Sequence, residues 1–204
     1  MSLLHGEVVN RKWMVAAAIA AILAIVGGAY VGRNLLFDDS VTRTPASEKP
    51  RRPAVVVFHE TVSDVSLRYP GNWTRRRSTE DNVPLVAVAP DGETSLLVRV
   101  QVTGLDDVTS KTLPIVRKYT DPLVEADKTV KLLGPPQAVT VGGLLGYRYR
   151  YTYRAGAGAH DHYFLFKRGR MIALVFQATP ASRLDALEPQ FERLARSFSG
   201  TGPS

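Results

Sequence analysis

Several short segments of the chain alternate apolar and polar residues with a period of two, which is the pattern of half-buried β-strands. Residues 145–154 show it most clearly, because every second position from Tyr147 on is a tyrosine. The turn sequences Pro90-Asp91-Gly92 and 167–170 are expected to join neighbouring strands as hairpins. The other predicted strands, rich in β-branched and aromatic residues, are residues 54–60, 65–69, 83–89, 96–102, 163–166 and 171–178.

Two segments have the helical period instead. Residues 108–124 place apolar side chains at helical spacing, with Thr109 and Ser110 as candidate N-caps and Pro114 in the first turn. A second stripe lies near the C-terminus, where Pro189 is expected to kink or restart the helix. Its apolar members are Leu184, Leu187, Phe191, Leu194 and Phe198. The order of strands, helix, strands, helix predicts an α+β fold with an antiparallel β-sheet flanked by helices.

The N-terminal region has neither period, since residues 13–31 carry no charge and form no polar stripe. This length matches the roughly 20 residues that cross a bilayer as a helix. An aromatic residue lies near each end and basic residues flank the segment, as is typical of membrane interfaces. The candidate anchor residues are Arg11, Lys12, Trp13, Tyr30 and Arg33. A single-pass transmembrane helix is therefore predicted, and a signal peptide cleaved near Gly27-Gly28-Ala29 is the alternative.

The orientation of this helix follows from the parts on either side of it. A short N-terminus with Arg11 and Lys12 is usually retained in the cytoplasm, whereas a long C-terminal domain is translocated largely regardless of its charge. The domain is therefore expected outside the cytoplasmic membrane. The predicted parts are a cytoplasmic N-terminus (1–12), a transmembrane helix (13–32), a Pro/Arg-containing linker (33–53), an extracytoplasmic domain (54–199) and a flexible tail (200–204).

Composition excludes several classes of function. The chain has no cysteine, which removes disulfides, thiolate metal sites and cysteine nucleophiles. Its net charge of +7 lies partly beside the predicted membrane helix, and no nucleic-acid recognition motif accompanies it. We therefore expect a lipid bilayer and another membrane protein as partners, and no nucleic acid.

The strand of alternating tyrosine and arginine is the leading candidate for a partner or ligand surface. Tyrosines on one face and guanidinium groups on the other could form a groove for an anionic lipid or a protein. The alternative is a half-buried strand that packs its tyrosines against a helix and leaves its arginines in water. The candidate surface residues are Tyr147, Arg148, Tyr149, Arg150, Tyr151 and Tyr153, together with the charged loop run Arg75, Arg76 and Arg77.

His160 and His162 are weak candidates for a metal site. They lie at i and i+2 around Asp161, in a segment expected to be a hairpin connection, and two imidazoles on one face could bind zinc or copper with His59-Glu60 nearby. We favour solvated hairpin residues and no metal. No nucleophile elbow, phosphate loop or buried carboxylate pair is recognisable, so neither an enzyme nor a cofactor is expected.

Four sequence runs resemble the PsbP-like family, over roughly residues 55–199. They are VSLRYPGNW (65–73), GYRYRYTY (146–153), RMIALVFQATP (170–180) and FERLARSF (191–198). The family includes the extrinsic PsbP subunit of photosystem II, a Ran-binding nuclear import factor and actinobacterial envelope proteins of the LpqN type. The resemblance implies an α/β/α sandwich that serves mostly as an accessory or binding domain without a shared catalytic motif. The chain lacks a lipobox cysteine and looks more similar to a membrane-anchored actinobacterial branch.

The sequence thus leads to one main functional hypothesis and two alternatives. The main one is a non-enzymatic accessory or binding subunit on the extracytoplasmic face, docking on a larger envelope or respiratory membrane complex. The first alternative is a carrier of lipid or envelope precursor with a pocket between sheet and helix. The second is a hydrolase or metalloprotein that depends on His160 or His162.

Overall fold

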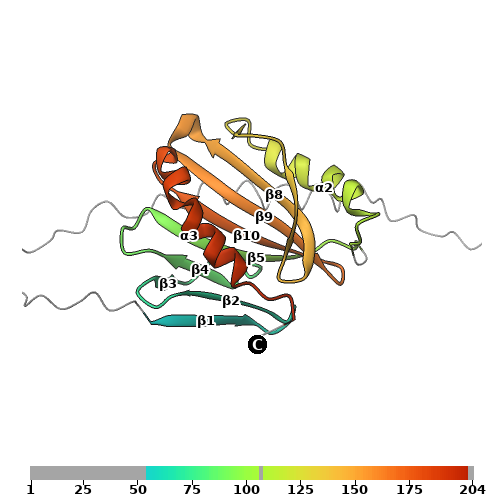
Figure 1. Ribbon diagram of the computed structural model, residues 1–204, viewed down its shortest axis with the longest axis horizontal. Coiled ribbons are helices and arrows are strands. Elements are labelled where there is room, and N and C mark those ends of the chain that lie inside the picture. The colour runs from blue at the N-terminus through green and yellow to red at the C-terminus, as the bar shows by residue number, and fades with distance from the viewer. Residues whose placement is uncertain (1–53, 106–107, 202–204) are drawn as a thin grey trace, which may run out of the picture.

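The computed structural model describes residues 54–105 and 108–201, which contain one large antiparallel sheet. Its strands are β3 (Thr74–Arg76), β4 (Leu85–Val88), β5 (Thr94–Val102), β6 (Lys131–Leu132), β7 (Gln137–Val141), β8 (Leu144–Tyr153), β9 (Gly158–Lys167) and β10 (Arg170–Ala178). They are ordered β3-β4-β5-β10-β9-β8-β6, and β7 also pairs with β8 (Figure 1). The three long central strands β8, β9 and β10 form the part of the sheet on which both helices pack.

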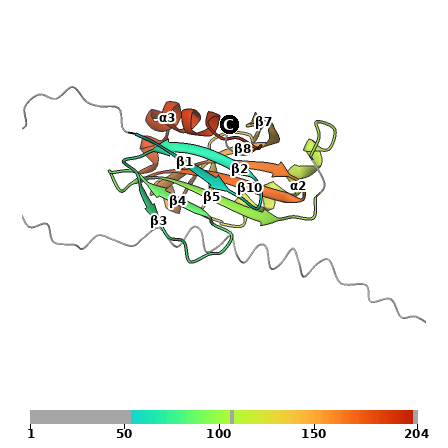
Figure 2. The ribbon, with the colours of Figure 1, turned by 90° about the horizontal axis from the view of Figure 1, so that it is seen from below.

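A separate two-stranded hairpin, β1 (Val55–Glu60) and β2 (Val65–Pro70), lies on one face of this sheet beside helix α3 (Leu184–Arg196). Figure 2 shows the hairpin and α3 on the same side of the sheet. Phe58, Leu67 and Tyr69 of the hairpin belong to the core cluster that α3 closes. The hairpin is joined to the end of the chain by mutual backbone bonds between Ser66 and Ser199.

Helix α2 (Leu113–Glu125) covers part of the opposite face, so the layers are helix, sheet, and helix with hairpin. Because side chains alternate along a strand, each central strand contributes to both layers. On β10, Leu174 and Phe176 point toward α3, whereas Ala173 and Val175 belong to the cluster under α2. The predicted antiparallel sheet flanked by helices is confirmed.

The predicted hairpins around Pro90-Asp91-Gly92 and 167–170 are confirmed, as β4 with β5 and β9 with β10. The C-terminal helix continues through Pro189 as one element, so the expected restart is wrong. Proline removes one helical hydrogen bond there. The buried stripe on both sides of it, including Leu184 and Phe191, keeps the helix on the sheet.

Helix α2 begins later than predicted. Its N-cap is Thr112 rather than Thr109 or Ser110, and Pro114 lies in the first turn as expected. The residues before it form a local turn instead, in which the Thr109 and Thr112 hydroxyls bond each other's backbone N–H groups. Such side-chain bonds compete with helix formation.

Candidate functional site

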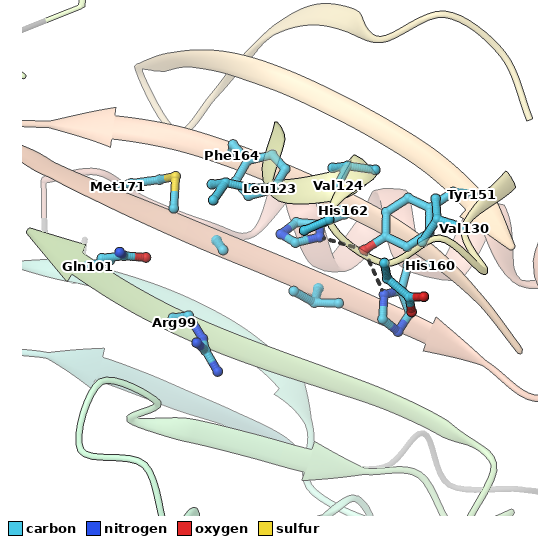
Figure 3. A pocket seen from close by; sticks show the side chains of 14 residues that line it. Arg99, Gln101, Leu123, Val124, Val130, Tyr151, His160, His162, Phe164 and Met171 are labelled. Atoms are coloured by element: carbon cyan, nitrogen blue, oxygen red, sulfur yellow. Dashed lines mark hydrogen bonds between the residues drawn. The ribbon is translucent and has the colours of Figure 1, made fainter. Parts of the chain in front are cut away.

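Two histidines and a tyrosine form a hydrogen-bonded cluster under α2. The antiparallel pairing of β8 with β9 places Tyr151 opposite His160. The Tyr151 hydroxyl lies 2.9 Å from Nδ1 of His160 and 3.1 Å from Nδ1 of His162 (Figure 3). A hydroxyl has one proton, so it donates to one imidazole and accepts from the other. We call these three residues the His-Tyr-His cluster.

The predicted position of these histidines in a solvated hairpin connection is wrong. β9 begins at Gly158, and His160 and His162 are only 4% and 8% exposed. The chain reverses earlier, in a short 3₁₀ turn at Arg154–Gly156. The alternation of β9 then continues through the histidines, which share a face with Phe164, while Asp161 points to the other face.

A small cavity of about 40 Å³ adjoins the His-Tyr-His cluster, between the sheet and α2 (Figure 3). Its lining includes Arg99 and Gln101 of β5, Val124 of α2, and Met171 of β10. A water needs about 10–15 Å³ of such volume, so the cavity has room for about three waters. A lipid tail does not fit it unless α2 moves.

Burial keeps both histidines neutral. Desolvation lowers the pKa of His160 to about 4, although a side-chain hydrogen bond with Gln177 acts in the opposite direction. Desolvation also places the pKa of His162 well below its ordinary value, and the nearby His160 and Arg99 lower it further. Burial likewise raises the pKa of Tyr151. The cluster is therefore uncharged at neutral pH.

One feature of His162 fits a metal ligand, but the other ligands that a metal site needs are not in place. Nε2 of His162 is buried and has no hydrogen-bond partner, as a metal ligand would. However, residues 54–105 and 108–201 contain no group of three side chains placed to hold a metal ion. His59, the expected additional ligand, lies on β1 in the other sheet and contacts Asp64 at 3.3 Å.

The tyrosines of β8 pack against the helix layer, as the alternative interpretation predicted. Tyr147, Tyr149, Tyr151 and Tyr153 are all buried, and the first three belong to the α2-side cluster. The Tyr149 hydroxyl donates to Asp121 Oδ1 at 2.5 Å and lies 2.6 Å from the hydroxyl of Thr120 on α2. These side chains are walls of the interior rather than an exposed groove.

The arginines of β8 lie on the α3 side and form ion pairs, so the expectation that they point into water is wrong. Arg148 donates from Nε and Nη2 to the two carboxylate oxygens of Asp161, at 2.6 and 2.7 Å, and from Nη2 to Glu188 of α3. Arg150 donates to Asp185 at 2.7 Å. The predicted alternation of tyrosine and arginine along β8 is correct, but the arginine face is covered by α3, which carries acidic residues.

Arg99 of β5 is likewise a buried arginine that forms an ion pair. Alternation along this strand places Arg99 and Gln101 opposite the apolar face of Leu96 and Val98, in the layer under α2. Arg99 is 2% exposed, and its Nη2 lies 2.6 Å from Glu80 Oε2. The strand is therefore buried on both faces.

The basic run belongs partly to a strand. Arg75 and Arg76 lie in β3 at the edge of the large sheet, Arg77 follows it, and all three are exposed. Nη2 of Arg75 donates to the carbonyl oxygen of Pro84 at 3.1 Å. Its guanidinium carbon lies 5.8 Å from the centre of the Phe58 ring, so the basic run adjoins β1.

β1 carries an exposed apolar surface that the sequence interpretation missed. Val55, Val56 and Val57 are 63%, 38% and 54% exposed. Three consecutive valines cannot all face one core when side chains alternate, and this signal was present in the sequence. We call these three valines the β1 surface.

Known structures resemble this arrangement at low sequence identity. The solution structure of the cyanobacterial PsbP protein CyanoP from Synechocystis matches with a TM-score of 0.56 and 16% identity, covering 76% of this chain and 96% of that chain. The domain has a PsbP-like fold. The crystal structure of LpqN, involved in cell envelope biogenesis of Mycobacterium tuberculosis, matches the same PsbP-like domain with a TM-score of 0.50 and 14% identity, covering 72% and 90% of the two chains. No family model matches the chain, and neither does any curated protein sequence.

The predicted anchor lies outside the residues that the structure describes. This applies to Arg11, Lys12, Trp13, Tyr30 and Arg33. Within the described ranges, neither helix has the length and apolar character needed to cross a membrane.

Proposed function

We propose that the PsbP-like domain belongs to a membrane-anchored, non-enzymatic accessory or binding subunit. It is held on the extracytoplasmic face of the cytoplasmic membrane and docks on a larger envelope or respiratory membrane complex. The proposal rests on the β1 surface, whose first residue Val55 is separated by one residue from the predicted linker of residues 33–53.

The position of β1 suits docking beside a membrane. A linker of about 20 residues, as predicted for 33–53, would have a random-coil end-to-end distance of roughly 25 Å, so β1 would stay close to the bilayer and to the outer parts of membrane proteins. Exposed apolar residues gathered on one element are typical of interaction sites. Val62, in the turn after β1, is also apolar and is 68% exposed.

The buried polar groups support a role without catalysis. In the His-Tyr-His cluster both Nδ1 atoms are bonded to Tyr151, and both rings are held neutral by burial. Arg148 and Asp161 neutralise each other inside the fold. These groups stabilise the domain and are not arranged around a substrate-sized cleft.

The docking function is tested with the full chain in gently solubilised membranes. We expect one membrane protein to co-isolate at a fixed ratio with the wild type. The Val55→Ser/Val57→Ser variant should recover about tenfold less of it, because tenfold corresponds to about 1.4 kcal/mol and the two partly exposed valines together lose contacts of that order. The matched control is Ile115→Ser/Tyr119→Ser on α2, which removes side chains of similar exposure, 51% and 47%. Absence of any such partner, or equal recovery with both variants, would contradict the proposal.

A second candidate is a carrier of lipid or envelope precursor, which the apolar walls of the cavity under α2 favour. The carrier must open this cavity, because about 40 Å³ holds no acyl chain. Native mass spectrometry of the purified full chain tests it. If the protein is a carrier, the wild type should retain a bound lipid, and the Val124→Trp variant, whose larger side chain fills the cavity, should lose it. The mass of the protein without lipid in both samples argues against the carrier.

A further inference from the structure

The hydrogen bonds of β2 show which backbone groups of β1 have no partner among the described residues. The N–H and C=O groups of Ser66 bond to Ser199, at 3.0 and 2.8 Å. Those of Arg68 bond to the hydroxyl of Ser197, both at 3.0 Å. These groups of β2 therefore point away from β1.

In an antiparallel pair, two residues that lie opposite each other either exchange two backbone hydrogen bonds or point their N–H and C=O groups away from the partner strand. His59 lies opposite Ser66 and Val57 lies opposite Arg68. Their N–H and C=O groups consequently point to the open side of β1. The same applies to Val55, whose opposite residue, Pro70, has no N–H group to donate.

The open edge of β1 lacks the features that normally prevent strand pairing. Natural edge strands are short, charged, interrupted by proline or bulged. β1 has six residues in unbroken register with β2, contains no lysine, arginine or proline, and begins with three exposed valines. Its one carboxylate, Glu60 at the end of the strand, accepts hydrogen bonds from the N–H groups of Val62 and Ser63. Such an edge pairs readily with another strand.

The outer strands of the large sheet differ from β1 in this respect. β3 has three residues, two of them arginine, and β6 has two, one of them lysine. β7 follows two prolines, Pro135 and Pro136, and packs its valines against the core. The contrast suggests that the unprotected edge of β1 has an occupant.

The charge next to β1 indicates what that occupant carries. Arg75 is held beside Phe58 of β1, and Arg76 and Arg77 are exposed next to it. Among the described acidic residues, none forms an ion pair with these three arginines. Opposite charges across an interface favour the correct partner and speed its association.

From these observations we infer that β1 binds its partner by strand addition: an extended, acidic segment of the partner pairs with the open edge of β1. This inference rests on the proposed docking function and specifies the partner of the same surface. A strand satisfies both the N–H and C=O groups of Val55, Val57 and His59, which an apolar contact alone does not. A second copy of this chain would instead bring two arginine runs to one interface.

Photo-crosslinking in native membranes identifies the occupant. The full chain carries p-benzoylphenylalanine at position 57, or at position 115 on α2 as a matched exposed control. Position 57 should crosslink to one segment of a membrane protein that is rich in Asp and Glu, and position 115 should not. Crosslinks from position 57 to lipid, to a second copy or to residues 1–53 of the same chain would each overturn the inference.

Two variants at one position separate backbone pairing from side-chain contact. Val57→Pro removes an outward N–H and leaves the bonds between β1 and β2 in place, so partner recovery should fall about tenfold, as expected for a lost hydrogen bond and a disturbed edge. Val57→Thr keeps the N–H and a β-branched side chain and should stay within about threefold of the wild type. The triple variant Arg75→Gln/Arg76→Gln/Arg77→Gln should recover less partner than the wild type at low salt. Its recovery should then change little as salt is added, because the charges that salt screens are gone.

The outcomes distinguish this inference from the docking function itself. Full recovery with Val57→Pro and loss with Val55→Ser/Val57→Ser would retain docking and overturn strand addition. If no partner co-isolates with the wild type, both the docking function and strand addition are overturned. If Val57→Pro unfolds β1, amide exchange of the wild type decides instead: strand addition requires slower exchange at Val57 and His59 in the complex, and unchanged exchange contradicts it.

Discussion

The two faces of the central sheet are built from the same strands but are stabilised differently. On the α3 side, the helix inserts a fully buried phenylalanine, Phe191, which stacks on Phe176 at 5.2 Å. On the α2 side, the buried helix residues are smaller and include a threonine, Thr120, bonded to Tyr149. Both faces have an apolar core, but only the α2 side places hydroxyl and imidazole groups within it, around a small cavity.

This difference follows from alternation along β8 and β9. The tyrosines of β8 and the histidines of β9 occupy one face, whereas Arg148, Asp161 and Tyr163 occupy the other. A polar group on either face must find a partner, because burying it unpaired is costly. The α3 face meets this requirement with ion pairs at the margin of an apolar core, whereas the α2 face places neutral hydrogen bonds at its centre.

The largest effect is expected from the apolar anchor on the α3 face. Phe191→Ala should lower the free energy of unfolding by about 4 kcal/mol, because it removes a large side chain and leaves a cavity beside Phe176. The counterpart on α2, Val116→Ala, should cost about 1.6 kcal/mol for two buried carbon groups. Urea denaturation of the two variants measures the difference. Equal costs would show that the two helices are held with similar strength.

A somewhat smaller effect is expected from the ion pair on the same face. Arg148→Met leaves Asp161, which is 1% exposed, without its bidentate partner, and should cost about 3 kcal/mol. The double variant Arg148→Met/Asp161→Leu removes both charges and should recover most of this loss. Chemical denaturation of the single and double variants tests the pair. A double variant as unstable as the single one would show that packing, and not the unpaired carboxylate, determines the cost.

These ion pairs also show how far the sequence predicts the fold and the site. Alternation was sufficient to assign Arg148 and Tyr149 to opposite faces of one strand. It did not reveal that Asp161 and Glu188 would meet Arg148, because their approach depends on strand register and on the placement of α3. Contacts between distant segments are not encoded in local periodicity.

The histidines and the β1 surface were missed for different reasons. The glycines Gly156 and Gly158 indicated a long connection, so the strand that begins at Gly158 was assigned too late and His160 was interpreted as solvated. For the β1 surface, β-branched residues predicted the strand correctly, but composition does not distinguish an edge strand from a central one. Only the pairing pattern identifies Val57 as a residue with outward backbone groups.

Acid should weaken the α2 face before the α3 face. Burial lowers the pKa of His160 to about 4, whereas an unfolded histidine titrates near 6.5, so the unfolded chain binds more protons as the pH falls below about 6.5. The stability that the fold gains from a neutral His160 is therefore fully present above about pH 6.5 and is lost as the pH falls. At pH 5 we expect a loss of about 2 kcal/mol from His160 alone. Denaturation of the wild type and of His160→Gln between pH 7 and pH 5 measures it; parallel curves would mean that His160 stays exposed to protons in the folded state.

The smallest effect concerns the hydroxyl at the centre of the α2 face. Tyr151→Phe keeps the ring and removes the hydroxyl that bonds Nδ1 of both His160 and His162, so it should cost about 1–2 kcal/mol, as for a buried hydrogen bond left unmade. Tyr147→Phe on the same strand face is the matched control and should change stability by less than about 0.5 kcal/mol. Thermal and urea denaturation compare the two. If Tyr151→Phe is as mild as the control, water from the adjoining cavity replaces the lost hydroxyl, and the α2 face tolerates polar rearrangement that the α3 face does not.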